Sequence, residues 1–410
     1  MTDARFLFVL PEGPHATVID SQVVDTIVAV AREGIRFDLL FLAEPRPWLT
    51  QRAYFARRRA EIASRTGGRV RVVPVPRKRM MLGAAAATAL LLAEIVATPG
   101  RRRVVVHGRT DWAAWYASRV ARVHPNLRYV YDARGDGEPE FRLEARELGL
   151  SAEATERMVQ KLYRVRAEAV AGASHVLAVS TVLRDRIVAQ TGIDPSRTTV
   201  VPCVADAGKF HLDEAERRAV RRELGLEDRF VVVYPGRFGR WHYGPETCRV
   251  VRGLMDADPT VFFLVLTPDT EAAAALAHEL LPEGRYAIRS AAHAEVPRFL
   301  HAADLGILLR APDPLNEVAC PTKFAEYVMS GLPVLISRGI GDCSGFDAEH
   351  DAGAVLETAD PDAAVAALAR IRAEDGEKRR ARIAEAGKRL SRQRYAREMA
   401  ALYRRIAEGA

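Results

Sequence analysis

Short apolar segments alternate with helical patterns along the whole chain, and the alternation runs through two successive series. This pattern is typical of parallel sheets covered by helices, the α/β class of folds. Strands are expected at 5–10, 37–42, 70–74, 104–107, 127–131 and 175–179, and again at 230–234, 260–266, 286–288, 305–309, 333–336 and 354–356. We therefore expect two Rossmann-like doubly wound domains, at 1–200 and 205–385, with ligands bound in a shared cleft beyond the carboxyl ends of the strands.

Composition narrows the kind of protein. A length of 410 residues suits two domains, and 49% hydrophobic with 28% charged residues is ordinary for a globular protein. The net charge of +7 comes with no nucleic-acid motif, so no nucleic-acid partner is expected. The four cysteines lack CxxC spacing, which argues against a zinc site or a disulfide framework. The apolar run at 6–10 is too short for a signal peptide, so a cytoplasmic protein is expected.

The stretch 319–337 concentrates the chemistry of the second half. It holds a Pro-Thr-Lys turn, an amphipathic helix, a Gly-Leu-Pro break and an apolar strand, with Thr322, Lys323 and Glu326 at i, i+1 and i+4. The amide groups of a helix N-terminus favour an anion, and Lys323 adds a full positive charge. Glu326, one turn on, can accept hydrogen bonds from two neighbouring hydroxyls. The stretch predicts a site for a diphosphate joined to a ribose, the alternative being a plain surface helix.

This stretch resembles the donor-binding segment of family 4 glycosyltransferases (glycosyltransferase group 1), which have the GT-B fold. The resemblance implies a nucleotide-diphosphate sugar as donor substrate, transfer with retention of configuration and no required cofactor. It also implies that Glu326 holds the ribose, while Thr322 and Lys323 lie against the phosphates. Many family members have a further Glu that contacts the transferred sugar. Here that position is Val318, and Glu317 is one residue out of register.

A second phosphate-binding candidate follows the first strand of the second domain. Gly236 lets the backbone approach a phosphate, and Arg237 and Arg240 can supply charge and paired donors. The turn resembles the Gly-Arg turn of family 4, in which the arginine contacts the donor phosphates, so Arg237 and Lys323 are assigned to stabilising the leaving group. Many members have a Lys where this chain has His242. The alternative is an ordinary turn with solvated arginines.

Two further residues are assigned to the donor. Arg310 follows the strand at 305–309 and is a phosphate candidate. His293 lies in the segment 290–297, which resembles the loop that frames the nucleobase in the family. A helix cap or a surface position is as acceptable a reading of His293 as a contact with the base.

The first domain is expected to bind the acceptor. Gly13 and His15 lie in a loop after the first strand, where the family has a flexible glycine-containing loop near the acceptor. Arg109 and Arg134 each follow a strand and should point toward the ligand.

Chemistry at the acceptor hydroxyl needs a proton acceptor. In a retaining enzyme the leaving phosphate itself can take that proton. In an inverting one, Asp132 is the first candidate for general base and His107 the second. No Asp-x-Asp motif follows an apolar strand, so we expect no required metal ion.

Two segments concern the surface of the first domain. The basic residues 77–79 precede an alanine- and leucine-rich run at 80–96, which is either a helix covering the sheet or a peripheral contact with a membrane. A charged amphipathic stretch at 381–408 ends the chain. By resemblance, the segment 386–410 should pack back on the first domain.

The sequence as a whole predicts a glycosyltransferase that moves a sugar to a hydroxyl of a glycan, a lipid-linked glycan or a small-molecule glycoside. Two alternatives stay open. A UDP-sugar 2-epimerase shares the fold but needs carboxylates around the sugar and no acceptor. A non-catalytic partner that scaffolds an active transferase would tolerate the changes at Val318 and His242.

Overall fold

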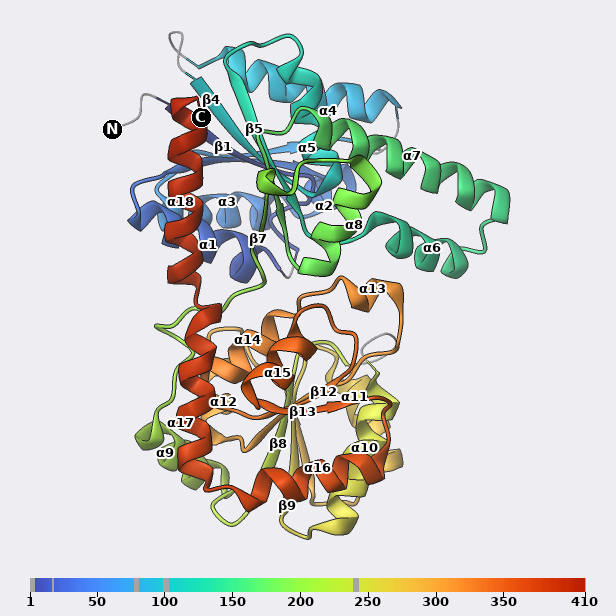
Figure 1. Cartoon of the computed structure of the whole chain (residues 1–410), viewed down its shortest axis with the longest axis vertical. Helices are drawn as coiled ribbons and strands as arrows, with labels where there is room; N and C mark the ends of the chain where they lie inside the picture. Colours follow the sequence, from blue (N-terminus) through green and yellow to red (C-terminus); the bar gives the residue numbers. More distant parts are fainter. Residues whose placement is uncertain (1–3, 17, 77–80, 99–102, 239–242, 410) are drawn as a thin grey trace. The chain divides into compact units, whose positions relative to one another are not determined.

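The computed structural model describes residues 4–16, 18–76, 81–98, 103–238 and 243–409. The chain forms two compact units, Met1–Pro202 with Arg392–Ala410, and Cys203–Ser391 (Figure 1). The C-terminal segment 386–410 is thus divided between them, since the chain up to Ser391 lies in the second unit and Arg392 onward lies in the first.

The first unit has a seven-stranded sheet in the order β3-β2-β1-β4-β5-β6-β7, in which every pair of neighbours is parallel. The strands are β1 (Ala4–Leu10), β2 (Phe37–Ala43), β3 (Val70–Pro74), β4 (Arg103–Arg109), β5 (Leu127–Ala133), β6 (His175–Ala178) and β7 (Thr198–Val200). The helices are η1 (Ile19–Val24), α1 (Asp25–Arg32), α2 (Pro45–Thr50), α3 (Arg52–Thr66), α4 (Met81–Val96), α5 (Thr110–Ala121), α6 (Gly137–Glu147), α7 (Ala152–Ala171), α8 (Thr181–Thr191), η2 (Pro195–Arg197) and α18 (Arg392–Glu408).

The second unit has a six-stranded parallel sheet in the order β10-β9-β8-β11-β12-β13. The strands are β8 (Phe230–Pro235), β9 (Val261–Leu266), β10 (Tyr286–Arg289), β11 (Leu305–Leu308), β12 (Val334–Ser337) and β13 (Gly353–Leu356). The helices are α9 (Glu214–Leu224), α10 (Gly244–Ala257), α11 (Thr270–Leu280), α12 (Val296–Ala302), α13 (Pro314–Glu317), α14 (Thr322–Met329), α15 (Cys343–His350), α16 (Pro361–Ala373), α17 (Gly376–Gly387) and η4 (Lys388–Leu390).

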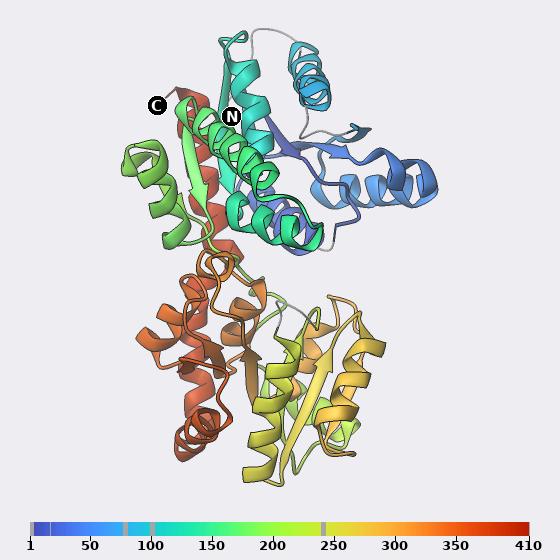
Figure 2. The same cartoon turned by 90° about the vertical axis from the view of Figure 1, so that its right-hand side faces the viewer.

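Successive side chains of a strand point to opposite faces of the sheet, and in the second sheet helices bury the side chains on both faces. Val231 and Val233 of β8 point to the face covered by α12, α14 and α17. Val232 and Tyr234 point to the opposite face, covered by α10, α11 and α16 (Figure 1 and Figure 2). All twelve strands expected from the sequence are present in the two sheets, and no end differs by more than two residues.

Helix α18 supplies part of the core of the first unit. Its buried face packs with α1 and with Phe6 and Phe37 of the sheet. The ring centroid of Tyr403 lies 5.0 Å from that of Phe37 and 6.2 Å from that of Phe6. The single helical stretch expected at 381–408 is wrong, since α17 ends at Gly387 and α18 begins at Arg392. A Cβ on Gly387 would lie 2.8 Å from backbone atoms of α14, so this close helix contact requires glycine.

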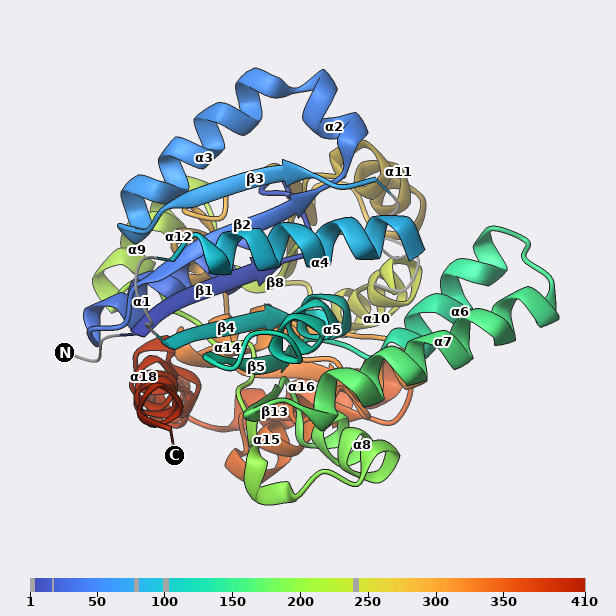
Figure 3. The ribbon, with the colours of Figure 1, turned by 90° about the horizontal axis from the view of Figure 1, so that it is seen from above.

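Helix α4 is the apolar run that the sequence left open between a covering helix and a membrane contact. One face of it is buried, and its Glu94, only 2% exposed, pairs with Arg5 of β1 and with Arg69 and Arg71. Figure 3 shows the course of α4 over the sheet of the first unit. Helix α4 is therefore a covering helix of the first unit. Its other face exposes Leu82. The basic residues 77–79 lie outside the described residues. Within the described ranges, no helix has the length and apolar character needed to cross a bilayer.

Candidate functional site

The second unit brings Gly236 and Lys323 together at the carboxyl edge of its sheet. Gly236 follows β8 with φ of +116°, and its N–H donates to the carbonyl of Leu266 at 2.7 Å. A Cβ at this position would lie 3.1 Å from the Nζ of Lys323. A side chain here would meet both a disfavoured backbone conformation and the ammonium group, so the turn requires glycine.

Lys323 is a half-buried cation without a carboxylate partner within 4.0 Å in the described part of the chain. Its Nζ lies 3.8 Å from the centroid of the Tyr234 ring, a cation–π contact. Burial and the charge of Arg310 lower the pKa of Lys323 well below its usual range, and Glu326 offsets this only in part. An anion bound here would relieve the unfavourable charge.

Arg310 is the second cation of this edge and follows β11. Burial lowers its pKa from the ordinary value, although neighbouring Tyr234 and Cys343 oppose the shift. Its backbone N–H donates to Ser337 Oγ at 3.0 Å, which positions the start of the side chain. Its Nε has no hydrogen-bond partner among the described residues. Two adjacent cations with this little compensation indicate a site that takes an anion.

Helix α14 adds its N-terminus to the same place. It begins at Thr322, and its N-cap residue Pro321 provides no side-chain cap. The amide groups of the first turn therefore receive no carboxylate or hydroxyl from the N-cap, and the positive end of the helix dipole adds to Lys323. Thr322 is half-buried at this end.

Glu326 and His293 form a pair one turn farther along α14. Glu326 is 5% exposed, and its Oε1 lies 3.2 Å from Nε2 of His293 in the loop before α12. The structure therefore places His293 beside the residue assigned to the ribose, which the sequence alone did not decide. The pair holds the carboxylate of Glu326 in one orientation.

Arg237 stands apart from this cluster. Its side chain is exposed, and Nη1 lies 3.5 Å from Oδ1 of Asp269 in the loop after β9. Its carbonyl accepts a hydrogen bond from the hydroxyl of Tyr234 at 2.8 Å. Arg240 and His242 lie outside the described residues. Val318 is 1% exposed and packs in the interior, so no carboxylate stands at that position.

In the first unit, Asp132 lies at the end of β5 and is nearly fully buried. Its Oδ2 lies 3.1 Å from Nε2 of His107, and the Nδ1 of His107 lies 2.6 Å from the hydroxyl of Tyr403 on α18. Burial alone would raise the pKa of Asp132, but Arg134, His107 and Arg109 together hold it well below its usual range. Burial also lowers the pKa of His107, whose ring stacks on Phe8.

These contacts do not favour either residue as a general base. The carboxylate of Asp132 is stabilised as an anion by neighbouring cations, and both ring nitrogens of His107 are engaged. Asp132 instead orients the two arginines assigned to the acceptor. Its oxygens lie 3.8 Å from Nη1 of Arg109 and 3.6 Å from Nη1 of Arg134.

Arg109 is held by two further residues that the sequence did not single out. Its Nη2 donates to Oε1 of Gln22 at 2.8 Å, and its Nε lies 3.5 Å from Oε2 of Glu12. The next residue, Thr110, has φ of +68°, which is strained for a β-branched side chain. Strain of this kind is concentrated at functional sites, which fits the assignment of Arg109.

The loop after β1 is only partly consistent with a ligand contact. Gly13 is buried, and a Cβ on it would lie 2.6 Å from the ring of His15. His15 is exposed, with its ring centroid 5.4 Å from that of Phe55.

Among the described residues there is neither a metal-type cluster nor a disulfide. No set of three or more His, Cys, Asp or Glu residues in the described ranges is arranged to hold a metal ion. The four cysteines are free thiols, and two of them, far apart in the sequence, are in contact. The backbone N–H of Cys203 donates to Sγ of Cys320 at 3.1 Å, directly before the Pro-Thr-Lys turn.

The fold of this chain is similar to that of several proteins of known structure. Anabaena Alr3699/HepE, solved in complex with UDP and glucose, superposes with a TM-score of 0.68 at 15% identity, covering 97% of this chain and 98% of that one. WaaG, a glycosyltransferase of lipopolysaccharide biosynthesis, gives 0.63 at 15% identity, covering 99% and 100%. A putative UDP-N-acetylglucosamine 2-epimerase from Listeria monocytogenes gives 0.58 at 12% identity, covering 99% and 97%. No curated protein matches the chain.

Two Rossmann-like domains with these neighbours define the GT-B fold, as the sequence predicts. Residues 19–203 match the glycosyl transferase 4-like domain. This match covers most of the first unit and agrees with the resemblance to family 4 enzymes that the sequence indicates.

Proposed function

We propose that this protein is a glycosyltransferase that moves a sugar from a nucleoside-diphosphate sugar to a hydroxyl. The observation that carries the proposal is the half-buried pair of Lys323, in the first turn of α14, and Arg310, which follows β11. Both lie by the turn after β8 that only glycine allows. The structures of Alr3699/HepE with UDP and with UDP-glucose support a donor of this class.

Each residue of the donor site has its own role in this reaction. Lys323, Arg310 and the N-terminus of α14 neutralise the diphosphate as it departs, so the leaving group needs no metal ion. Exposed Arg237 joins the phosphates when the donor is bound, after leaving Asp269. Glu326 accepts the ribose hydroxyls, and its contact with His293 keeps the carboxylate in place.

The acceptor is a hydroxyl of a glycan, a lipid-linked glycan or a small-molecule glycoside. Arg109 and Arg134 hold it, and Asp132 orients them. The transfer proceeds with retention, which needs no general base from the protein. Neither Asp132 nor His107 in the first unit is set up to take a proton. In that case the departing phosphate takes the acceptor proton.

A thermal-shift screen tests the donor site directly. UDP, GDP, dTDP, ADP and CMP are compared with and without EDTA, on the wild type and on Lys323→Ala. A ligand at 100 times its dissociation constant adds about 2.7 kcal/mol of stability, enough for a clear rise in Tm. One diphosphate that stabilises the wild type, is insensitive to EDTA and loses its effect in the variant supports the proposal. If none stabilises the protein, the site is wrong and a non-catalytic scaffold becomes the better account.

The second candidate is a UDP-sugar 2-epimerase, because a putative enzyme of that kind shares the fold. Such an enzyme needs carboxylates poised to exchange protons with the sugar. Of the buried carboxylates at the two sites, Asp132 is held ionised by arginines and Glu326 is paired with His293. Incubation with UDP-N-acetylglucosamine alone distinguishes the two, since only the epimerase forms the 2-epimer without an acceptor.

A further inference from the structure

A cavity lined by arginines lies in the second unit, at the end of the sheet where the strands begin. It has a volume of about 250 Å³ and is bounded by α9, α17 and Asp304, the residue that precedes β11. The groups assigned to the donor follow the strands, whereas Asp304 comes before one. Because the sheet is parallel, the two sites lie at opposite ends of the strands. Arg217, Arg218, Arg379 and Arg380 contribute to its wall.

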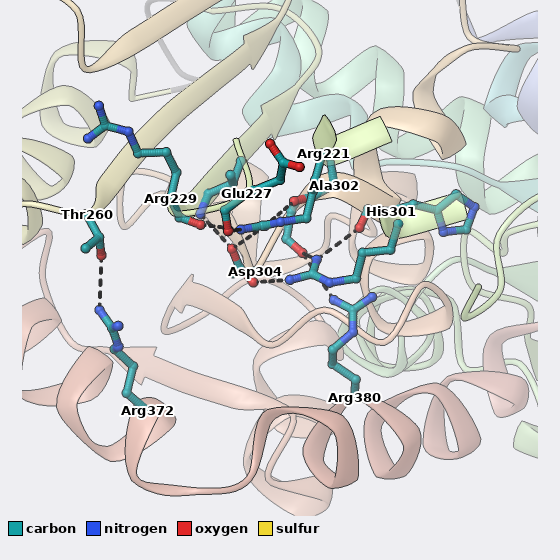
Figure 4. Close-up of polar contacts among 12 residues, drawn as sticks. Arg221, Glu227, Arg229, Thr260, His301, Ala302, Asp304, Arg372 and Arg380 are labelled. Atoms are coloured by element: carbon teal, nitrogen blue, oxygen red, sulfur yellow. Dashed lines mark hydrogen bonds and ion pairs between the residues drawn. The ribbon is translucent and has the colours of Figure 1, made fainter. Parts of the chain in front are cut away.

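The arginines are fixed by the carboxyl end of α12. Arg217 donates to the carbonyl of His301 at 3.0 Å, and Arg221 donates to that of Ala302 at 2.8 Å (Figure 4). Arg380 donates through Nη1 to the carbonyl of Ala303 at 3.1 Å. Cations are favoured at this end of a helix, so the guanidinium groups are held in place before any ligand arrives.

Neighbouring carboxylates use only part of the donor capacity. Asp304 pairs with Arg217 and lies 2.9 Å from Nη1 of Arg221, as Figure 4 shows for Arg221. Glu214 accepts from Nε of Arg380 at 3.1 Å. Arg380 is 6% exposed, and its Nη2 has no hydrogen-bond acceptor among the described residues.

Arg379 repeats this feature on the adjacent position of α17. It is 7% exposed, and its Nε also has no acceptor among the described residues, although Nη1 donates to the carbonyl of Ile371. Burial lowers the pKa of Arg379 and, together with Arg217, that of Arg380. Buried guanidinium donors without acceptors are costly and rare in folded proteins.

The charge of the wall is unbalanced as well. Four arginines face three carboxylates, those of Glu214, Asp304 and Glu377. We propose that this cavity is a binding site for one phosphate group, either as inorganic phosphate or as the phosphoryl group of a small metabolite. The planar donors of arginine match phosphate oxygens in pairs. The three carboxylates limit the site to one such group and disfavour a polyanion.

Binding would join α9 to α17 and so stabilise the second unit. The test is titration of the full-length protein with sodium phosphate at constant ionic strength, with sodium chloride as the reference, followed by calorimetry and by Tm. We expect saturable binding in the wild type and at least a tenfold weaker dissociation constant in Arg380→Gln. Lys388→Met, which removes an exposed cation of the same unit outside both sites, is the matched control and should leave this phosphate binding unchanged.

Because Arg380 is buried, circular dichroism must first show that its variant is folded. Arg218→Gln alters an exposed arginine of the same wall and provides a second test, with an expected loss of about threefold. Glucose 6-phosphate is titrated in parallel. Tighter binding than inorganic phosphate identifies a metabolite as the source, and equal or weaker binding identifies free phosphate. The proposal is overturned if phosphate acts no more strongly than chloride, or if Lys323→Ala abolishes the effect and Arg380→Gln keeps it.

Discussion

Replacing Lys323 by methionine should weaken nucleotide binding without destabilising the free protein. Methionine keeps the length of the side chain but removes the charge. The substitution forfeits the cation–π contact at 3.8 Å from the Tyr234 ring, worth about 1 kcal/mol in a partly buried site. It also removes an ammonium group whose pKa is lowered by burial and by Arg310. These effects oppose each other, so the free energy of unfolding should change by less than about 1 kcal/mol.

The substitution should reduce the free energy of diphosphate binding by more than it changes the free energy of unfolding. A hydrogen bond between a charged donor and a phosphate contributes about 1.5–3 kcal/mol, which corresponds to about a 10- to 100-fold change in the dissociation constant. Urea unfolding measures the first quantity and calorimetric titration with the stabilising diphosphate measures the second. Lys388→Met is the control, since that lysine is exposed and pairs with Glu385 one turn away. Equal affinity in Lys323→Met and the wild type would refute the reasoning, as would a loss of several kcal/mol in stability.

Three further predictions follow from individual contacts. Gly236→Ala should weaken diphosphate binding at least tenfold in the same titration, because φ of +116° and the 3.1 Å approach to Lys323 exclude a methyl group, and unchanged affinity would contradict this. Tyr403→Phe should cost about 1–3 kcal/mol in urea unfolding, since it leaves Nδ1 of buried His107 without its partner, and a neutral effect would show that the contact is unimportant. Burial and a neighbouring carboxylate raise the pKa of Asp347 from 3.8 to about 8, so the folded protein holds this proton more tightly than the unfolded chain. The protonated side chain of Asp347 therefore contributes its full stabilising free energy below about pH 4. This contribution is lost as the pH rises toward 8, by up to about 1.4 kcal/mol per pH unit. Asp347→Asn should flatten that part of the stability profile, and an unchanged slope between pH 5 and 8 would contradict the assignment.

Much of the fold follows from local pattern. Buried strands of four to seven residues stand out as apolar runs between helical segments, which is why all twelve expected strands are found. Strand β7 was missed, because Thr198, Thr199 and Val200 form a short and only half-buried segment that has no such run. The break between α17 and α18 was missed for a different reason. At the end of α17, Gly387 packs closely against the backbone of α14, and a tertiary contact of this kind leaves no periodic signal in the sequence.

The candidate donor site was predictable to the extent that it follows the strands. Gly236, Arg310 and Lys323 all lie near carboxyl ends of parallel strands, and this rule alone brings them to one edge. Their electrostatics were not predictable, since the low pKa of Lys323 depends on burial and on Arg310. The contact between His107 and Tyr403 could not be predicted from local sequence pattern either, because the two residues lie 296 positions apart in the chain.

The central claim is that Lys323 and its neighbours bind the diphosphate of a sugar donor. A crystal structure of the full-length protein with UDP, or with whichever diphosphate stabilises it, tests this most directly. The account predicts phosphate oxygens within hydrogen-bond distance of Nζ of Lys323 and of the first amides of α14, with the ribose hydroxyls on Glu326. A saturating ligand bound elsewhere, with Lys323 still against the ring of Tyr234 and no phosphate beside it, would contradict the claim.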